Sequence, residues 1–303
     1  MTVAGGRRYA LLLALHDSDY SKNAYGGYLN VFLDALRSDA DNGNETWDCF
    51  RVIDGEFPAT EDLHLYDGFV VSGSPHDAHG EASPSWVRRL CALLRAAHGM
   101  GKRVLGVCFG HQVLCRALGG AVGRAKGGWD VGVRKITFVE DEDNGDLEFL
   151  QELGLGRISS ATATAASRAS IIEVHQDEVW ELPPGGKVLA YSEKTRVEMF
   201  AVGGNVLGIQ GHPEYGTDIL LNLVGRLAGQ NAIDGPTAEE ARSTAESGGP
   251  DREFWTGLCK AFLRGGGGRG ASDDDRTMAV AEMSCSHHVF VAPSFPAGTA
   301  VGL

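Results

Sequence analysis

The sequence has no hydrophobic run long enough to cross a membrane, and it has no excess of positive charge. A membrane-spanning helix needs about 20 consecutive apolar residues, and no segment of this chain approaches that length. The apolar run at residues 9–15 follows two arginines, but it has only the length of a strand and no small-residue cleavage site follows it. It therefore predicts a core strand instead of a signal peptide. The net charge of −13 argues against nucleic acid as a partner, because phosphate binding needs a basic surface.

Paired cysteine motifs are also missing. The six cysteines stand at positions 49, 91, 108, 115, 259 and 285, with no CxxC spacing. Zinc sites and disulfide frameworks use closely spaced cysteines, so the sequence predicts neither a metal site nor any other cofactor. Scattered free thiols are typical of a reducing compartment, and we expect a cytosolic protein. His287 and His288 form too short a tract to argue for a metal.

Short apolar strands alternate with amphipathic helices over residues 9–264, and 43% of the residues are hydrophobic, enough for a full core. This alternation predicts an α/β domain with a mostly parallel sheet and helices on both faces. Strands are predicted at residues 9–15, 47–53, 65–71, 104–107, 130–139, 170–175, 188–191, 198–202 and 206–210. Helices are predicted at residues 29–36, 84–98, 109–118, 219–227 and 252–263, and a polar loop at 16–23. Residues 265–303 begin with a glycine run and predict a disordered tail.

A strand runs directly into a helix through Cys108, and Gly106 and Gly110 stand on either side of it. This arrangement has the logic of the nucleophile elbow, which presents a reactive side chain above a sheet edge. The amide groups at a helix N-terminus also stabilise a thiolate. Cys108 is therefore a candidate nucleophile, although a lone cysteine in a parallel sheet is more often simply a buried residue.

His212 and Glu214 follow the last predicted strand and stand two residues apart. In an extended segment both side chains project to the same side. A cysteine nucleophile needs a base to take its proton, and the base needs an orienting acceptor on its other ring nitrogen. Cys108, His212 and Glu214 supply these three roles. The loop at residues 72–77 also follows a strand and offers backbone N–H groups to a negative atom, although most such loops are only turns.

Two motifs together resemble the catalytic pair of the class I (triad) glutamine amidotransferase family: Gly106-Val-Cys-Phe-Gly-His-Gln112 and Gly211-His-Pro-Glu214. Further segments resemble the plant γ-glutamyl peptidases, stand-alone members of this superfamily that remove the γ-glutamyl group from glutathione conjugates in defence-compound synthesis. These segments are Tyr25-Gly-Gly-Tyr28, Phe50-Arg-Val-Ile-Asp-Gly-Glu-Phe-Pro58, Tyr66-Asp-Gly-Phe69, Ser72-Gly-Ser-Pro-His-Asp-Ala78, His175-Gln-Asp-Glu-Val179, Gln210-Gly-His-Pro-Glu-Tyr215 and Asp251-Arg-Glu-Phe-Trp255. The resemblance covers roughly residues 9–264 and implies a flavodoxin-like, three-layer fold.

The resemblance implies that Cys108 attacks the amide carbonyl of a γ-glutamyl group while backbone N–H groups of Ser74 and Phe109 bind the oxyanion. His212 would move the proton to the leaving amine, and Glu214 would fix its tautomer. A γ-glutamyl thioester would form, and water or another amine would resolve it. The segments expected to bind the glutamyl group contain Gly73, Gln112, His175, Gln176 and Asp177. Many members have Gly-Gly-Pro where this chain has Gly-Ser-Pro at 73–75, but only the backbone N–H is needed there.

We therefore expect a cysteine-dependent hydrolase of glutathione conjugates, with a small-molecule substrate and a role in plant sulfur or defence metabolism. The alternative is a glutaminase subunit that supplies ammonia to a separate synthetase chain. We expect no synthetase partner, and the chain itself contains no Walker A loop. Proteins of the intracellular-protease type place a histidine directly after the nucleophile, where this chain has Phe109. His111 is expected to be an ordinary packing residue. A non-catalytic binding protein is the least economical interpretation, because all three triad residues are present.

Overall fold

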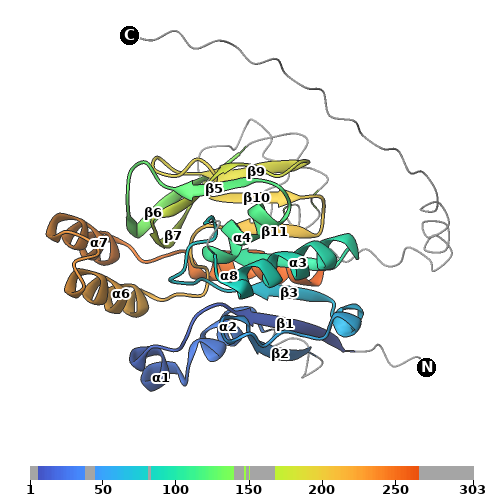
Figure 1. Ribbon diagram of the computed structural model, residues 1–303. Coiled ribbons are helices and arrows are strands. Elements are labelled where there is room, and N and C mark those ends of the chain that lie inside the picture. The colour runs from blue at the N-terminus through green and yellow to red at the C-terminus, as the bar shows by residue number, and fades with distance from the viewer. Residues whose placement is uncertain are drawn as a thin grey trace, which may run out of the picture. The chain divides into compact units, whose positions relative to one another are not determined.

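The computed structural model describes residues 6–37, 45–80, 83–139, 147, 150 and 168–265. In this part of the chain the central sheet has nine strands in the order β2-β1-β3-β4-β11-β10-β9-β6-β7 (Figure 1). Five neighbouring strands pair in parallel, namely β2 (Glu45–Arg51), β1 (Arg7–Leu13), β3 (Gly68–Val71), β4 (Arg103–Val107) and β11 (Val206–Ile209). The other four follow antiparallel: β10 (Met199–Val202), β9 (Gly186–Tyr191), β6 (Asp130–Phe138) and β7 (Arg168–His175).

Antiparallel pairing reverses the strand direction at each step. Consequently only β10 and β6 run against the other strands of this sheet, and the predicted mixed, mostly parallel sheet is confirmed. A separate antiparallel pair is formed by β5 (Ala121–Arg124) and β8 (Asp177–Glu181).

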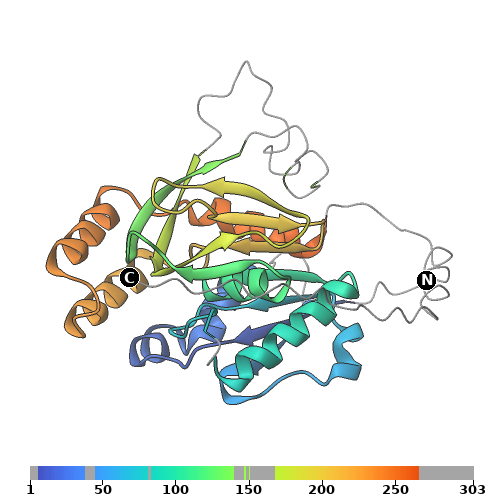
Figure 2. The same ribbon diagram turned by 45° about the horizontal axis from the view of Figure 1, so that its top comes forward.

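Helices cover both faces of the sheet, as the sequence predicted. Alternate residues of β1 point to opposite faces, and each face has its own core. Tyr9, Leu11 and Leu13 belong to one core, which also receives α2 (Tyr28–Leu36), α6 (Thr217–Gly229), α7 (Gly235–Ser247) and α8 (Arg252–Arg264). Ala10 and Leu12 belong to the other core, with α3 (Ser85–Gly99) and α4 (Phe109–Ala117). The two views in Figures 1 and 2 show these helices on opposite sides of the sheet.

The segment expected to be a polar loop at 16–23 is instead mostly helical. It contains α1 (Asp19–Tyr25), whose N-cap Ser18 accepts a hydrogen bond from the Ser21 amide at 3.0 Å. The left-handed Gly26 (φ 73°) ends this helix. The prediction was wrong because local capping, and not an apolar stripe, defines the element.

Further elements differ from the sequence prediction. The predicted strand at 65–71 begins only at Gly68, since Thr60–Leu65 forms a 3-10 helix. The helix α7 was missed because its buried face consists only of alanines, which give a weak apolar pattern. The strand β8 was missed because its sequence, Asp-Glu-Val-Trp-Glu, is mostly acidic.

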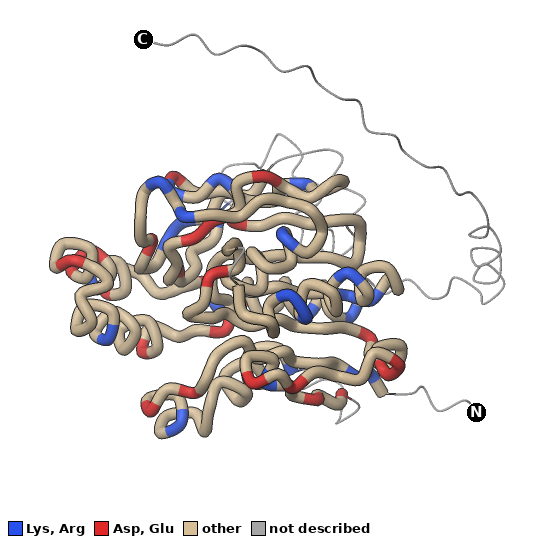
Figure 3. Tube along the Cα trace, in the orientation of Figure 1, with Lys and Arg blue, Asp and Glu red and all other residues tan. Residues whose placement is uncertain are grey.

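The predicted tail at 265–303 lies, apart from Gly265, outside the described residues, so the domain boundary stays a prediction. Within the described residues no helix combines the length and the apolar character that a bilayer span requires. Basic and acidic positions are interspersed along the described chain (Figure 3).

Candidate active site

Cys108 lies in the sharp turn between β4 and α4, with φ 52° and ψ −107°. Positive φ is uncommon for a residue with a side chain and marks backbone strain of the kind found at functional sites. Two glycines make room for the turn. A Cβ atom on Gly106 would collide with the carbonyl oxygen of Gly110, and one on Gly110 would collide with the carbonyl oxygen of Val71. The predicted elbow is therefore present, and its thiol is buried.

His212 lies just beyond β11, next to the elbow, and it is paired with Glu214. The His212 Nδ1 atom and the Glu214 Oε1 atom are 2.8 Å apart, and both residues are buried. The His212 backbone N–H donates to the Ile172 carbonyl at 2.8 Å, which anchors this segment to β7. Since Nδ1 is engaged by the carboxylate, the other ring nitrogen is left for the hydrogen bond with Cys108. The three predicted triad residues are thus brought together.

The charge state of His212 follows from these neighbours. Burial lowers its pKa, but the Glu214 carboxylate and the Cys108 sulfur outweigh burial and raise the pKa to about 10. A histidine that remains protonated at neutral pH favours a thiolate beside it. His212 is therefore held as an imidazolium beside the Cys108 sulfur, where it favours the nucleophilic form of cysteine.

Tyr215 stacks on the imidazole ring of His212. The two ring centroids are 4.1 Å apart and the planes differ by 4°. The face of a tyrosine ring attracts a cation, so this stack both fixes the orientation of the imidazole and favours its protonated form. Tyr215 was not predicted as a site residue from the sequence, although its place directly after His-Pro-Glu was the available signal.

The loop after β3 lies beside the Cys108 turn and close to His212. The Ser72 hydroxyl accepts from the Ala14 amide and donates to the Gly73 carbonyl, each at 2.9 Å, which ties the loop to the end of β1. A Cβ atom on Gly73 would lie 3.1 Å from the His212 Cε1 atom, so the loop backbone passes close to the base. Ser74 lines the same cavity as Cys108. The amide of Phe109 is the first of α4, and first-turn amides have no acceptor within their helix. Oxyanion binding by Ser74 and Phe109 stays a prediction.

A cavity of about 600 Å³ opens above Cys108. Its size is that of a small-molecule site. The walls are largely apolar and aromatic, with a few polar groups, among them the exposed Arg226. The side chains that define this character are Leu15, Tyr28, Ile53, Trp86, Trp129, Val174, Leu223 and Leu227. These wall residues could not be predicted from the sequence, because they come from separate elements and share no local motif.

Of the residues predicted to bind the glutamyl group, Gly73 is among the described residues that line this cavity. Gln112, His175, Gln176 and Asp177 are not. Gln112 Nε2 donates to the Asp177 carbonyl at 2.8 Å and to Gln210 Oε1 at 3.2 Å. His175 Nδ1 lies 3.0 Å from the same Asp177 carbonyl. Gln176 is half-buried, and its carbonyl accepts from the amide of Ala125, just after β5, at 2.9 Å. These residues form a layer behind the wall, and their contact with substrate stays a prediction.

His111 is fully buried, and its ring packs against Phe200 with the centroids 5.0 Å apart. Burial lowers its pKa to about 3, so it stays neutral. The residue behaves as the packing residue that the sequence analysis expected. It contributes no charge to the site.

Fold and site together have the arrangement of a cysteine-dependent catalytic triad on an α/β sheet. Residues 49–218 match the family described as "Glutamine amidotransferase class-I", and the chain belongs to that family. Gamma-glutamyl peptidase 5 of Arabidopsis thaliana is 46% identical over 259 residues, which cover 86% of this chain and 96% of the relative. Gamma-glutamyl peptidase 3 of the same plant is 44% identical, with 86% and 97% covered. The resemblance seen in the sequence is confirmed.

Solved structures show the same fold at lower identity. A glutamine amidotransferase from Thermotoga maritima has a TM-score of 0.61 and 20% sequence identity, covering 86% of this chain and 97% of that one. A glutamine amidotransferase from Methylobacillus flagellatus has the same TM-score at 16% identity, covering 89% and 98%.

The first prediction concerns the elbow. Replacing Gly110 with alanine places a methyl group against the Val71 backbone, and we expect a loss of about 1–3 kcal/mol in the free energy of unfolding from overpacking. Urea denaturation measures it. Gly99→Ala is the matched control, because Gly99 is also helical and nothing lies within 4 Å of its added Cβ. Equal stability of the two variants would contradict the close approach.

The second prediction concerns the charge of His212. Its folded-state pKa of about 10 lies above the ordinary 6.5, so its stabilising contribution is complete below pH 6.5 and is lost as the pH rises through 10. Glu214→Gln removes the carboxylate and should lower the pKa. NMR titration of the His212 ring, assigned with a His212→Gln variant, measures the shift. The exposed Glu246→Gln should leave it unchanged, and an unshifted midpoint in Glu214→Gln would refute the assignment.

The third prediction separates the ring of Tyr215 from its hydroxyl. Tyr215→Phe keeps the aromatic face and should leave the pKa of His212 near its wild-type value. Tyr215→Leu removes the face and should lower that pKa, because the imidazolium loses a cation–π contact of roughly 0.5–2 kcal/mol. The same NMR titration measures both variants. Identical pKa values in the two would show that stacking does not support the charge.

Proposed function

We propose that this protein is a cysteine-dependent hydrolase that removes γ-glutamyl groups from glutathione conjugates through a γ-glutamyl thioester. The observation that carries the proposal is the Cys108 elbow beside the buried His212–Glu214 pair, at the floor of a cavity with aromatic walls. The relatives named γ-glutamyl peptidase, at 46% and 44% identity over most of the chain, support the substrate class.

The reaction begins with attack of the Cys108 thiolate on the side-chain carbonyl of the γ-glutamyl group. The negative charge on the tetrahedral carbonyl oxygen is held by the backbone N–H groups of Ser74 and Phe109. The imidazolium of His212 then gives its proton to the departing amine, and the carbon–nitrogen bond breaks. A thioester remains on Cys108. Neutral His212 next takes a proton from water, which attacks the thioester and releases glutamate.

Glu214 keeps the imidazole in one tautomer through both half-reactions, because its carboxylate accepts the Nδ1 proton at 2.8 Å. An amine that enters in place of water would receive the γ-glutamyl group, which is transpeptidation. The hydrolytic and transfer reactions share every step up to the thioester.

The cavity walls support a conjugate in preference to free glutamine. Glutamine occupies only a small part of a space of about 600 Å³, whereas a glutathione conjugate carries both a peptide and an apolar sulfur substituent. Aromatic rings such as Tyr28, Trp86 and Trp129 offer the contact area for that substituent. Arg226 on the same wall offers a positive charge for the carboxylate of the leaving peptide. We place this activity in plant sulfur or defence metabolism in the cytosol, without a synthetase partner.

The fourth prediction tests the substrate. Purified protein is incubated with glutathione, S-benzylglutathione and free glutamine, and the release of glutamate and ammonia is followed. We expect glutamate from the S-benzyl conjugate, little ammonia from glutamine, and at least a 1,000-fold loss of rate in Cys108→Ala, on the order of what removal of a nucleophile costs. Cys49→Ala, which changes a cysteine on β2 away from the cavity, serves as control.

Ammonia from glutamine with the conjugate untouched would overturn the peptidase proposal and favour the glutaminase alternative. A synthetase partner would then be sought by testing whether a second chain raises the glutaminase rate.

A further inference from the structure

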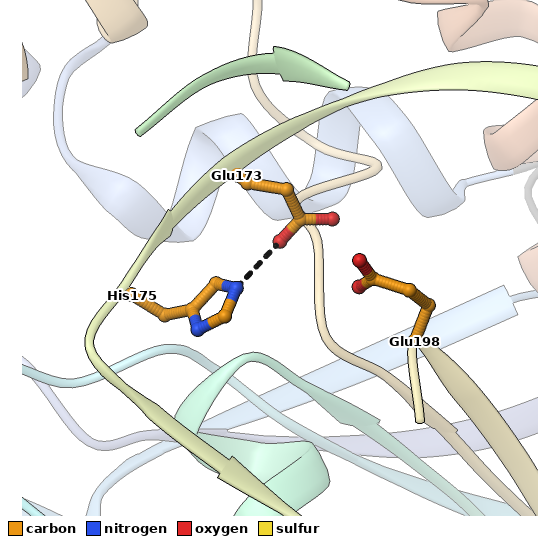
Figure 4. A group of neighbouring side chains, drawn as sticks. All are labelled: Glu173, His175 and Glu198. Atoms are coloured by element: carbon orange, nitrogen blue, oxygen red, sulfur yellow. Dashed lines mark ion pairs between the residues drawn. The ribbon is translucent and has the colours of Figure 1, made fainter. Parts of the chain in front are cut away.

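Three side chains that could bind a metal meet behind the active-site wall. Glu173 and His175 lie on β7, and Glu198 directly precedes β10. Their exposed fractions are 0%, 4% and 2%. One ligand atom from each lies within 4.8 Å of those of the other two. Figure 4 shows both carboxylates and the imidazole pointing toward one another.

Five polar atoms of this cluster have no partner of suitable hydrogen-bond geometry in the described part of the chain. This holds for both carboxylate oxygens of Glu173, both of Glu198, and Nε2 of His175. Buried polar groups of native proteins are nearly always satisfied, so each exception asks for an explanation. Here the unsatisfied atoms point at one common space.

The cluster also holds more negative charge than its protein surroundings compensate. Asp130 nearby is paired with Arg134 and Lys194, at 2.6 and 3.5 Å. Two buried carboxylates need positive charge, either as protons or as a cation.

The tautomer of His175 turns a lone pair toward this space. Its Nδ1 atom faces the Asp177 carbonyl at 3.0 Å, and a carbonyl only accepts, so Nδ1 carries the proton. The lone pair of Nε2 therefore faces Glu173 Oε2 at 3.5 Å. Two ligands of a tetrahedral zinc ion, with bonds of about 2.0–2.2 Å, lie about 3.4 Å apart. The 3.5 Å between Nε2 and Oε2 therefore fits two ligands of one ion.

We propose that Glu173, His175 and Glu198 bind one divalent transition-metal ion, and that the ion is zinc. Imidazole nitrogen and carboxylate oxygen are ligands that zinc accepts. Its two positive charges balance the two carboxylates. The hydrogen bond from His175 Nδ1 to a backbone carbonyl is the outer contact that metal-binding histidines usually have. This departs from the sequence expectation of no metal, which considered only closely spaced cysteine and histidine motifs.

The ion has a structural role, because it ties together two strands that are separated in the sheet by β9 and β6. One of them, β7, also contacts the catalytic segment. The Ile172 carbonyl accepts from the His212 amide at 2.8 Å, and Val174 lines the cavity. The Val174 carbonyl lies 3.9 Å from Cys108 Sγ. Glu173 and Glu198 are thus positioning residues, which hold β7 against the active site without touching substrate.

The fifth prediction tests the ion by its presence. The full chain is purified without chelator and without a histidine tag, and its metal content is measured by mass spectrometry. We expect about one zinc per chain in the wild type and at most about a tenth of that in Glu198→Gln, which keeps the shape but removes the charged ligand. Glu239→Gln changes a carboxylate that is 80% exposed and should keep the full zinc content.

A second readout is thermal. Chelation should lower the midpoint of thermal unfolding in the wild type and in Glu239→Gln, and added zinc should restore it, because a ligand that binds only the folded state stabilises it. Added zinc should not raise the midpoint of thermal unfolding of Glu198→Gln or of Glu173→Gln.

Wild-type protein with less than about a tenth of an equivalent of metal, and no zinc-dependent shift in its midpoint, would overturn the proposal and show that protons compensate the carboxylates. Zinc retained at full content in both variants would place the ion elsewhere, for example at His287 and His288, and would overturn it equally. If the variants do not fold, the wild-type content and midpoint still decide. None of these readouts depends on the proposed γ-glutamyl activity.

Discussion

The buried hydrogen bond between His212 Nδ1 and Glu214 Oε1, 2.8 Å long, is the interaction on which the site depends. It selects the tautomer that leaves the other ring nitrogen for Cys108, and it holds enough negative charge beside the ring to raise the pKa of His212 to about 10 despite burial. Because a buried charge is costly unless paired, neither residue would be stable there alone. Cys108, the stacked Tyr215 and the cavity above them are arranged around this pair.

The sheet explains how residues from distant segments reach the same place. Parallel strands deliver their carboxyl ends to one edge, and β3, β4 and β11 bring the Gly73 loop, Cys108 and His212 there. The antiparallel strands then carry β7 back to the same edge, where an isolated bridge joins Ile172 to His212. The site is therefore closed on one side by the far end of its own sheet.

Local chemistry decides what the sequence could predict. The Cys108 elbow needs glycines only a few residues away, and His212 and Glu214 lie within a segment of three residues. Both features could therefore be predicted from the sequence. The mixed sheet followed from the alternation of strands and helices. Tyr215 was adjacent to a motif, yet its role depends on a ring geometry that only the folded chain defines. Helix α7 was missed because alanines bury little surface and leave a weak pattern.

The sequence could not predict that Glu173 and Glu198 lie close together. Two strands, β9 and β6, separate β7 from β10 in the sheet, so the contact exists only in the folded chain. A signal existed in each segment, since a glutamate interrupts an apolar run in Ile-Ile-Glu-Val and in Val-Glu-Met-Phe. All three carboxylates are buried, but Glu214 faces a histidine that carries the compensating proton, whereas His175 presents a lone pair to Glu173. The same residue types thus form a hydrogen-bonded pair in one place, and in the other the cluster for which we propose a cation.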